Sequence, residues 1–273
     1  MTGTGEIPFH AREWLLAHGK SLTLGPKAVL MGILNVTPDS FSDGGEIASV
    51  DDAVTRAIKM SDDGAAIVDV GGESTKPGAV AVSAEQEQAR VLPVVKALSE
   101  LPNMLISIDT YRADTARKAV EMGAHIINDV WGCQKEPEIA DVVVETGSGL
   151  CAMHTGRERN RDRDVIADQF AFLEKTLEIA ANAGIGEQQI VLDPGFGFAK
   201  DPVENLSLLA RFEELHDLKH PLLVGTSRKR FIGHATGNET DKRDIATAAT
   251  SVVARMKGGA LFRVHDIAAN RDA

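Results

Sequence analysis

Residues 31–45 read MGILNVTPDSFSDGG, an apolar run that stops at a polar segment containing glycine. The pattern recurs seven more times, and most residues between the runs have helical spacing. The other runs are IVDVGGESTKPG (67–78), LISIDTYR (105–112), HIINDVWG (125–132), LCAMHTGR (150–157), IVLDPGFGFAK (190–200), LLVGTSRKRF (222–231) and LFRVHD (261–266). Eight strand–loop–helix units predict an α/β fold, a closed (β/α)8 TIM barrel whose post-strand loops meet at one rim.

The segments between the strands carry apolar residues at helical spacing. Glycine ends several of them, because the left-handed backbone that closes a helix suits glycine. The predicted helices cover residues 51–63, 83–98, 112–122, 137–146, 165–183, 202–212 and 242–256. The segment 266–273 after the last strand has room for about 12 Å of helix at 1.5 Å per residue, so we expect a short last helix.

Residues 1–27 precede the first unit, and we expect them to form an N-terminal extension of a single barrel domain that spans 1–273. Leu22 and Leu24, just before Gly25 and Pro26, are candidates for a short hairpin that plugs the bottom of the barrel. A doubly wound open sheet is the alternative fold. It is disfavoured because no G-x-G-x-x-G follows the first strand and polar residues end all eight strands.

The composition restricts the class of protein. A chain of 273 residues with 43% hydrophobic residues suits one barrel of this type. The net charge of −11 argues against binding to nucleic acid or to an anionic membrane, so an anion site needs local basic groups. The sequence has no membrane-length apolar run, no secretory leader pattern and only two cysteines. We therefore expect a cytoplasmic protein.

Basic residues gather after strands seven and eight. Arg263 and His265 are two residues apart at the end of strand eight, so their side chains are expected to face the same way. The run TSRKR (226–230) follows strand seven directly, and this part of such barrels commonly holds phosphate. The competing interpretations are a surface ion pair for Arg263, a cap on Asp266 for His265, and a solvated turn for the run. The basic pair at one strand end favours an anion site.

Asp109, Asn128 and Asp193 end strands three, four and six. Such groups suit a neutral heterocycle rich in N–H groups, since a carboxylate accepts two donors side by side and asparagine both donates and accepts. Helix capping is the competing explanation. Thr110 can cap the helix after Asp109, however, and Asp193 precedes a Pro–Gly turn.

Asn35 ends strand one, where its side-chain oxygen is a candidate neighbour of phosphate or Mg²⁺, although a plain turn is also possible. The long segments after strands one and two are expected to close over a substrate as lids. His154, after strand five, fits a structural role at least as well as a functional one. The cysteines and histidines have no zinc-type spacing.

Seven of these segments together resemble dihydropteroate synthase, a pterin-binding enzyme family of bacterial folate synthesis. They are LNVTPDSFSDGG, DVGGESTKPGA, SIDTYR, NDVWG, LDPGFGFAK, GTSRKRF and RVHD, in order over about residues 29–266. The resemblance implies a transferase that joins 6-hydroxymethyl-7,8-dihydropterin diphosphate to p-aminobenzoate and releases diphosphate. It also implies Mg²⁺ as cofactor, a homodimer, and inhibition by sulfonamides, which compete with p-aminobenzoate.

The resemblance also implies a role for each matching residue. The pterin ring would be held by Asp109, Asn128, Asp193 and Lys229, and of these Asp109, Asp193 and Lys229 would be catalytic. Diphosphate would be held by Asn35, Thr75, Arg263 and His265, with Asn35 at the Mg²⁺ ion and Asp39 close by. p-Aminobenzoate would be held by Phe41, Thr75, Pro77, Phe198, Ser227 and Arg228.

This chemistry predicts a dissociative substitution. Diphosphate leaves readily once Mg²⁺, Arg and His match its charge, and positive charge then develops on the pterin methylene. The arylamine is neutral near pH 7 and needs no strong base, while closed lids exclude water.

The chain departs from the family pattern at three places, of which one is the short segment after the last strand, expected to weaken the last helix and the dimer contact. Two other functions compete. Lys76 stands where the family commonly has arginine and loses the bidentate fork, and MHTGRERNRDRD (153–164) differs from the usual form. The competing functions are a pterin-binding methyltransferase domain and an inactive pterin-binding paralogue. The first would not need Arg263, His265 or the Ser–Arg–Lys run, since its ligand has no diphosphate, and retention of the anion-site residues argues against both.

Overall fold

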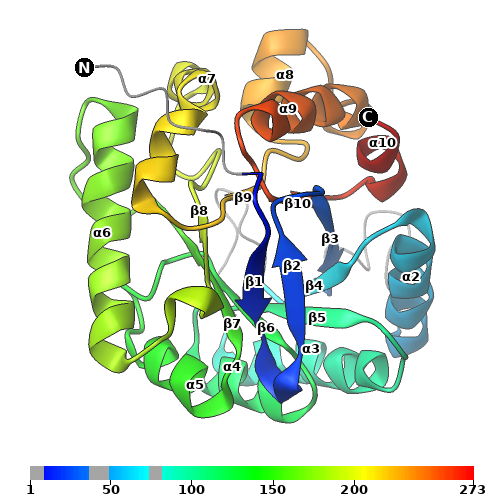
Figure 1. The fold of residues 1–273 in the computed structure, drawn as a ribbon. Coiled ribbons are helices and arrows are strands. Elements are labelled where there is room, and N and C mark those ends of the chain that lie inside the picture. Colours follow the sequence, from blue (N-terminus) through cyan, green and yellow to red (C-terminus); the bar gives the residue numbers. More distant parts are fainter. Residues whose placement is uncertain (1–8, 37–48, 74–81) are drawn as a thin grey trace.

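The structure is a computed structural model that describes residues 9–36, 49–73 and 82–273. Its central sheet has eight parallel strands in the order β8-β7-β6-β5-β4-β3-β10-β9, and a parallel bridge between Leu192 and Leu222 joins the two ends of that order (Figure 1). The strands are β3 (Val29–Asn35), β4 (Ile67–Gly71), β5 (Leu105–Asp109), β6 (Ile126–Asp129), β7 (Gly149–Met153), β8 (Ile190–Asp193), β9 (Leu223–Val224) and β10 (Leu261–Val264). The predicted TIM barrel is confirmed, and the open sheet is excluded.

Helices alternate with these strands and surround the barrel (Figure 1). They are α2 (Val50–Asp63), α3 (Ala84–Ser99), α4 (Ala113–Glu121), α5 (Glu138–Thr146), α6 (Val165–Ala183), α7 (Pro202–Ala210), α8 (Arg230–Thr236), α9 (Asp244–Met256) and α10 (Ile267–Asp272). The seven predicted helices are confirmed to within two residues at each end. Helix α8 was not predicted, because its seven residues include Gly233 and follow a basic run that was interpreted as a loop.

Local sequence explains where the helices begin and end. Ser83 and Gln86 form a reciprocal capping box at the start of α3, and Asp201 and Glu204 form another at the start of α7. Gly184 ends α6 in the left-handed conformation, at φ 95°, which few other residues adopt without strain.

The bottom of the barrel is closed by an antiparallel hairpin of β1 (Arg12–Leu15) and β2 (Ser21–Leu24), as predicted. Trp14 and Leu24 are fully buried and pack with residues at the start of several barrel strands, among them Met31 and Ile67. The indole Nε1 of Trp14 donates a hydrogen bond to the carbonyl of Gln189 at 2.9 Å. The hairpin therefore acts as an apolar plug.

The last helix is short, as expected, and spans six residues. Asp266 caps it by accepting from the N–H of Ala269 at 2.9 Å, and the guanidinium of Arg271 donates to the carbonyl of Asp63 at the end of α2. No helix among the described residues is long and apolar enough to cross a membrane.

Candidate active site

Strand register places the predicted rim residues in one row. Asn35, Gly71, Asp109 and Asn128 are successive lateral partners on β3, β4, β5 and β6. Asp69 lies two residues below Gly71 on β4 and points to the same side of the sheet. Residues from four strands thus meet at the carboxyl end of the barrel, where barrels of this type carry their active sites.

Arg263 joins two of the acidic residues. Its Nε donates to Oδ2 of Asp69 at 2.6 Å, and its NH2 group donates to Oδ2 of Asp109 at 2.7 Å. The same Asp69 oxygen accepts from Nδ2 of Asn128 at 3.0 Å. The sequence suggested an anion site or a surface ion pair for Arg263. The structure instead pairs it with buried carboxylates, so the acidic and basic rim groups form one network.

Burial changes the proton affinities in this network. It raises the pKa of Asp109 to about 7; Arg263 opposes the rise and the nearby Asp69 adds to it. Burial alone would lower the pKa of Arg263, but attraction to Asp69 and Asp109 holds that pKa above its usual value. The arginine therefore stays charged, while Asp109 can change its charge near neutral pH.

Asp193 and Lys229 form the second part of the site. A side chain at Gly225 would lie 3.6 Å from Oδ2 of Asp193 and 3.8 Å from Nζ of Lys229, so both groups face the space beside Gly225. Burial raises the pKa of Asp193, against the attraction of Lys229. Burial likewise lowers the pKa of Lys229 to about 8, with Asp193 opposing. The ammonium lies 4.5 Å from the ring centre of Phe198.

Ser227 and His265 lie together beside this pair. Oγ of Ser227 accepts from the backbone N–H of His265 at 3.1 Å and lies 2.9 Å from its Nδ1. Burial lowers the pKa of His265 to about 3, so the ring is neutral at pH 7. With the Ser227 hydroxyl donating to Nδ1, the ring proton is on Nε2. His265 does not cap a helix, since Asp266 performs that role.

The remaining predicted residues differ in position. Asn35 is exposed at the end of β3. Its Oδ1 and Oδ2 of Asp109 both face Gly71, since a Cβ on that glycine would lie 3.5 Å from the first oxygen and 3.6 Å from the second. Arg228 forms a bidentate ion pair with Asp244 at the start of α9, with both distances 2.7 Å. The predicted residues outside the described part of the chain are Asp39, Phe41, Thr75, Lys76 and Pro77.

Asp69 is the central residue that the sequence reasoning missed. It is fully buried, and its Oδ1 is one of the few buried side-chain oxygens in the described residues without a hydrogen-bond partner. The available signal was a carboxylate inside the apolar run IVDVG, where a strand buried on both faces has no structural use for a charge.

A family model described as pterin binding enzyme matches residues 31–265. Dihydropteroate synthase from Bacillus subtilis is 44% identical over 247 residues, which cover 90% of this chain and 86% of that protein. This chain belongs to the dihydropteroate synthase family. The Escherichia coli dihydropteroate synthase is also 44% identical and covers 93% of this chain and 91% of its own length. The resemblance predicted from seven motifs is confirmed.

Solved dihydropteroate synthases share the whole fold. The Xanthomonas albilineans dihydropteroate synthase with 4-aminobenzoic acid superimposes with a TM-score of 0.89 at 40% identity and covers 95% of both chains. A Clostridium difficile dihydropteroate synthase in the presence of pteroic acid gives 0.87 at 43% identity and covers 91% of this chain and 95% of that one. The rim network described above therefore belongs to an enzyme of the dihydropteroate synthase class.

Proposed function

We propose that this chain condenses 6-hydroxymethyl-7,8-dihydropterin diphosphate with p-aminobenzoate to give 7,8-dihydropteroate and diphosphate. The observation that carries the proposal is the rim network, in which Asp69, Asp109 and Arg263 lie across the barrel mouth with Asp193 and Lys229. The solved relatives with 4-aminobenzoic acid and in the presence of pteroic acid support the same substrate and product classes.

The acidic part of the rim suits the pterin ring. Asp109 and Asp193 supply carboxylate oxygens for ring N–H groups, Asn128 supplies an amide, and Lys229 donates to ring acceptors. The partly exposed Asp109 shares one oxygen with Arg263, so a second oxygen remains for a ligand. Charged acceptors in a water-poor pocket bind a ring with several N–H groups strongly.

The part of the rim at the ends of β3 and β10 suits the diphosphate. Asn35, Thr75, Arg263 and His265 are our candidates, and neutral His265 offers its Nε2–H as a donor. The described residues contain no cluster of three or more His, Cys, Asp or Glu that could hold a metal. The exposed amide oxygen of Asn35 fits Mg²⁺, which keeps several waters and binds through one or two protein oxygens plus substrate phosphates. Mg²⁺ bound there would neutralise the leaving group.

The p-aminobenzoate site lies next to Lys229 in this proposal. Phe198 lies under the Lys229 ammonium, and Ser227 is two residues before Lys229. The ion pair between Arg228 and Asp244 holds the segment around Arg228 in place, and Arg228 contributes to the p-aminobenzoate site in this indirect way. Thr75, Pro77 and Phe41 complete the set that we assign to this substrate.

The reaction follows from these positions. The bond between the pterin methylene carbon and the diphosphate oxygen breaks, and the electron pair leaves with diphosphate. Asp109 and Asp193 stabilise the positive charge that develops on the pterin. The neutral amine of p-aminobenzoate then forms the new C–N bond and loses a proton to solvent. Electrostatic stabilisation and positioning account for the rate acceleration.

We also propose a homodimer in the cytoplasm. Apolar side chains are exposed on the neighbouring helices α7 and α9, which Figure 1 shows on one side of the barrel. They are Val203 (70% exposed), Leu206, Ile245 (85%), Val252 and Met256 (69%). Large apolar side chains exposed on neighbouring helices commonly mark a protein interface. Analytical ultracentrifugation should give twice the chain mass of 29.1 kDa; a monomer at micromolar concentration contradicts the dimer.

One assay tests the enzymatic proposal. The purified protein is incubated with the dihydropterin diphosphate, p-aminobenzoate and Mg²⁺, and dihydropteroate is measured. We expect turnover that requires both substrates. Folded protein that binds pterin without forming product would be an inactive paralogue, and methyl transfer from a methylated pterin would indicate the methyltransferase alternative.

A further inference from the structure

The turn after β8, residues 193–200, has an unusual set of backbone contacts. Four successive carbonyls, from Asp193 to Phe196, each accept a hydrogen bond from a different residue. The donors are, in order, the backbone N–H of His154 (2.8 Å), Nε2 of Gln169 (3.1 Å), Nζ of Lys200 (2.9 Å) and Nζ of Lys229. This turn carries the Asp193 carboxylate at one end and Phe198 near the other, so these donors determine where two site groups lie.

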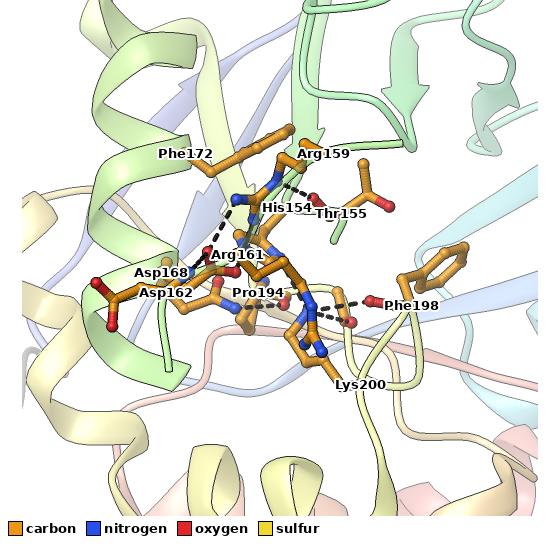
Figure 2. A network of polar contacts seen from close by, with 12 residues as sticks. His154, Thr155, Arg159, Arg161, Asp162, Asp168, Phe172, Pro194, Phe198 and Lys200 are labelled. Carbon is orange, nitrogen blue, oxygen red and sulfur yellow. Dashed lines mark hydrogen bonds and ion pairs between the residues drawn. The ribbon is translucent and has the colours of Figure 1, made fainter. Parts of the chain in front are cut away.

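Lys200 is a buried basic donor that the proposed reaction does not use. Figure 2 shows its side chain reaching back under the turn towards His154 and the Gly195 carbonyl. Only 7% of Lys200 is exposed, and its Nζ also lies 2.8 Å from Nδ1 of His154. An ammonium buried to this extent destabilises a fold unless its hydrogen bonds are satisfied. A purely structural position of this kind would favour an apolar side chain.

Further residues hold His154 in place (Figure 2). Nε2 of His154 lies 3.0 Å from Oδ2 of Asp168, and Arg159 binds both oxygens of Asp168 at 2.6 and 2.8 Å. Burial lowers the pKa of His154 to about 4, so the ring is neutral at pH 7. Nζ of Lys200 lies 2.8 Å from Nδ1 of the ring, and the NH2 group of Arg159 lies 2.8 Å from Nε2. The chain of contacts runs from Lys200 through His154 to Asp168 and Arg159.

The turn lies directly on His154. Gly195 has φ +64°, and a Cβ there would collide with the His154 carbonyl oxygen. Its N–H donates to Oδ1 of Asp193 at 2.7 Å. The same residue thus binds Lys200 through its carbonyl and Asp193 through its N–H. A shift of Lys200 is transmitted to the Asp193 carboxylate through a single residue, Gly195.

We propose that Lys200 is a positioning residue for the pterin site, which acts through Gly195 on the Asp193 carboxylate and is itself held by His154 and Asp168. The inference rests on the proposed function, since it assigns Asp193 to the pterin ring. It explains why the segment after β7 is tied so closely to the segment after β8. It also gives a role to His154 and to the lysine of the GFGFAK segment.

The central test is Lys200→Met, which keeps the aliphatic stem and removes the donors. We expect kcat/KM for the dihydropterin diphosphate to fall about 10- to 100-fold, since small misplacements of a substrate-binding group have effects of this size. KM for p-aminobenzoate should stay within about twofold. Binding of 6-hydroxymethylpterin, measured by fluorescence quenching, should weaken at least about fivefold, because one buried donor is lost.

Arg161→Gln is the matched control. Arg161 forms an ion pair with Glu204 at 2.9 Å and so joins the segment after β7 to α7, without a hydrogen bond to the turn. Pterin affinity that falls equally in Lys200→Met and Arg161→Gln would overturn the inference, because any contact between the two segments would then have the same effect. A fall in kcat/KM that is equal for the two substrates would overturn it as well. Unchanged pterin binding in folded Lys200→Met would do the same.

Two more variants keep the test decisive if Lys200→Met folds poorly. Lys200→Gln retains an amide donor and should recover part of the pterin affinity. Gln169→Leu removes the donor to the Pro194 carbonyl without touching Lys200 and should weaken pterin binding in the same direction. If both variants bind pterin like the parent, the inference is wrong.

An inactive parent protein would contradict the proposed function alone, because the pterin-binding comparison needs no turnover.

Discussion

The two ends of the barrel are built from the same strands in opposite ways. At the bottom, Trp14 and Leu24 of the hairpin pack with Ile67 and other apolar residues, and the buried cluster there contains only apolar side chains and a cysteine. At the top, the same strands carry carboxylates, an arginine and, on the adjoining segment, a lysine, all largely buried. Strand β4 shows the change within three residues, from Ile67 to Asp69.

The bottom of the barrel therefore contributes to the stability of the fold, and the top contributes to the chemistry of the site. Apolar burial at the bottom stabilises the fold by about 25 cal/mol for each Å² removed from water. Burying charges at the top destabilises the fold unless each is paired, and the pairs seldom return more than the desolvation penalty. The top therefore departs from the packing rules that the bottom obeys, as sites selected for function commonly do.

Arg263→Ala should have the largest effect, because it affects both properties. It leaves the Asp69 and Asp109 carboxylates without their cation, which should lower the free energy of unfolding by about 3–5 kcal/mol. Turnover should fall at least about 100-fold. Urea denaturation and the dihydropteroate assay measure the two effects. Near-normal turnover would remove Arg263 from the site.

Trp14→Ala should affect stability alone. Truncation of a fully buried Trp, with loss of its hydrogen bond to Gln189, should lower the free energy of unfolding by about 3–5 kcal/mol. At a temperature where the variant stays folded, kcat and both KM values should match those of the parent. Leu15→Ala, at an exposed neighbour on the same strand, is the control and should change stability by about 0.5 kcal/mol or less. A large change in kcat would mean that the two ends are coupled.

Lys229→Met should affect activity alone. It removes the cation beside Asp193 while retaining an apolar stem over Phe198, so kcat/KM should fall about 100- to 1000-fold. The melting temperature should change little, since burial already disfavours the charged amine. Arg230→Met, at the exposed next residue of the same basic run, serves as the control. Equal kinetics for the two variants would take Lys229 out of the site.

Acidification should reveal the smallest effect, through buried neutral histidines. Burial lowers the pKa of His125 to about 4, whereas an unfolded histidine titrates near pH 6.5. Below that pH the unfolded chain binds a proton that the folded chain does not, so stability is lost as the pH falls from about 6.5 towards 4.

The slope should be at most about 1.4 kcal/mol per pH unit for each such histidine. His125→Asn keeps an acceptor for the N–H of Ile106, which His125 binds through Nδ1 at 3.1 Å, and should flatten the slope. Unfolding free energies measured between pH 7 and 5 test this, and an unchanged slope in the variant would rule out His125 as a contributor.

Much of the fold and part of the site could be predicted. The apolar runs and helix caps of this chain act locally, so the strands, the seven longer helices and the hairpin were recognisable. The expectation that Thr110 caps the helix after Asp109 is wrong, because α4 begins after Arg112 without a side-chain cap and the Thr110 hydroxyl accepts from the N–H of Arg112 outside the helix. Helix α8 was missed, because seven residues with an internal glycine carry too weak a local signal.

The pairing of charged groups could not be predicted. The sequence did not indicate that Arg263 binds Asp69 and Asp109, which are 194 and 154 residues away in the chain. Arg228 is similarly held by Asp244. Such pairings depend on which side chains the closed barrel brings within about 3 Å, and sequence spacing carries no information on that distance.

The sequence by itself determined the order of strands and helices, the family, and the residue types present at each strand end. These follow from local periodicity and from motifs that each lie within one short segment. Only the tertiary structure decided which charges neutralise each other and which groups each buried lysine contacts. Closure of the barrel sets those distances, and burial within it sets the pKa values, so that Lys229 lies beside Asp193 while Lys200 is held under the turn by His154.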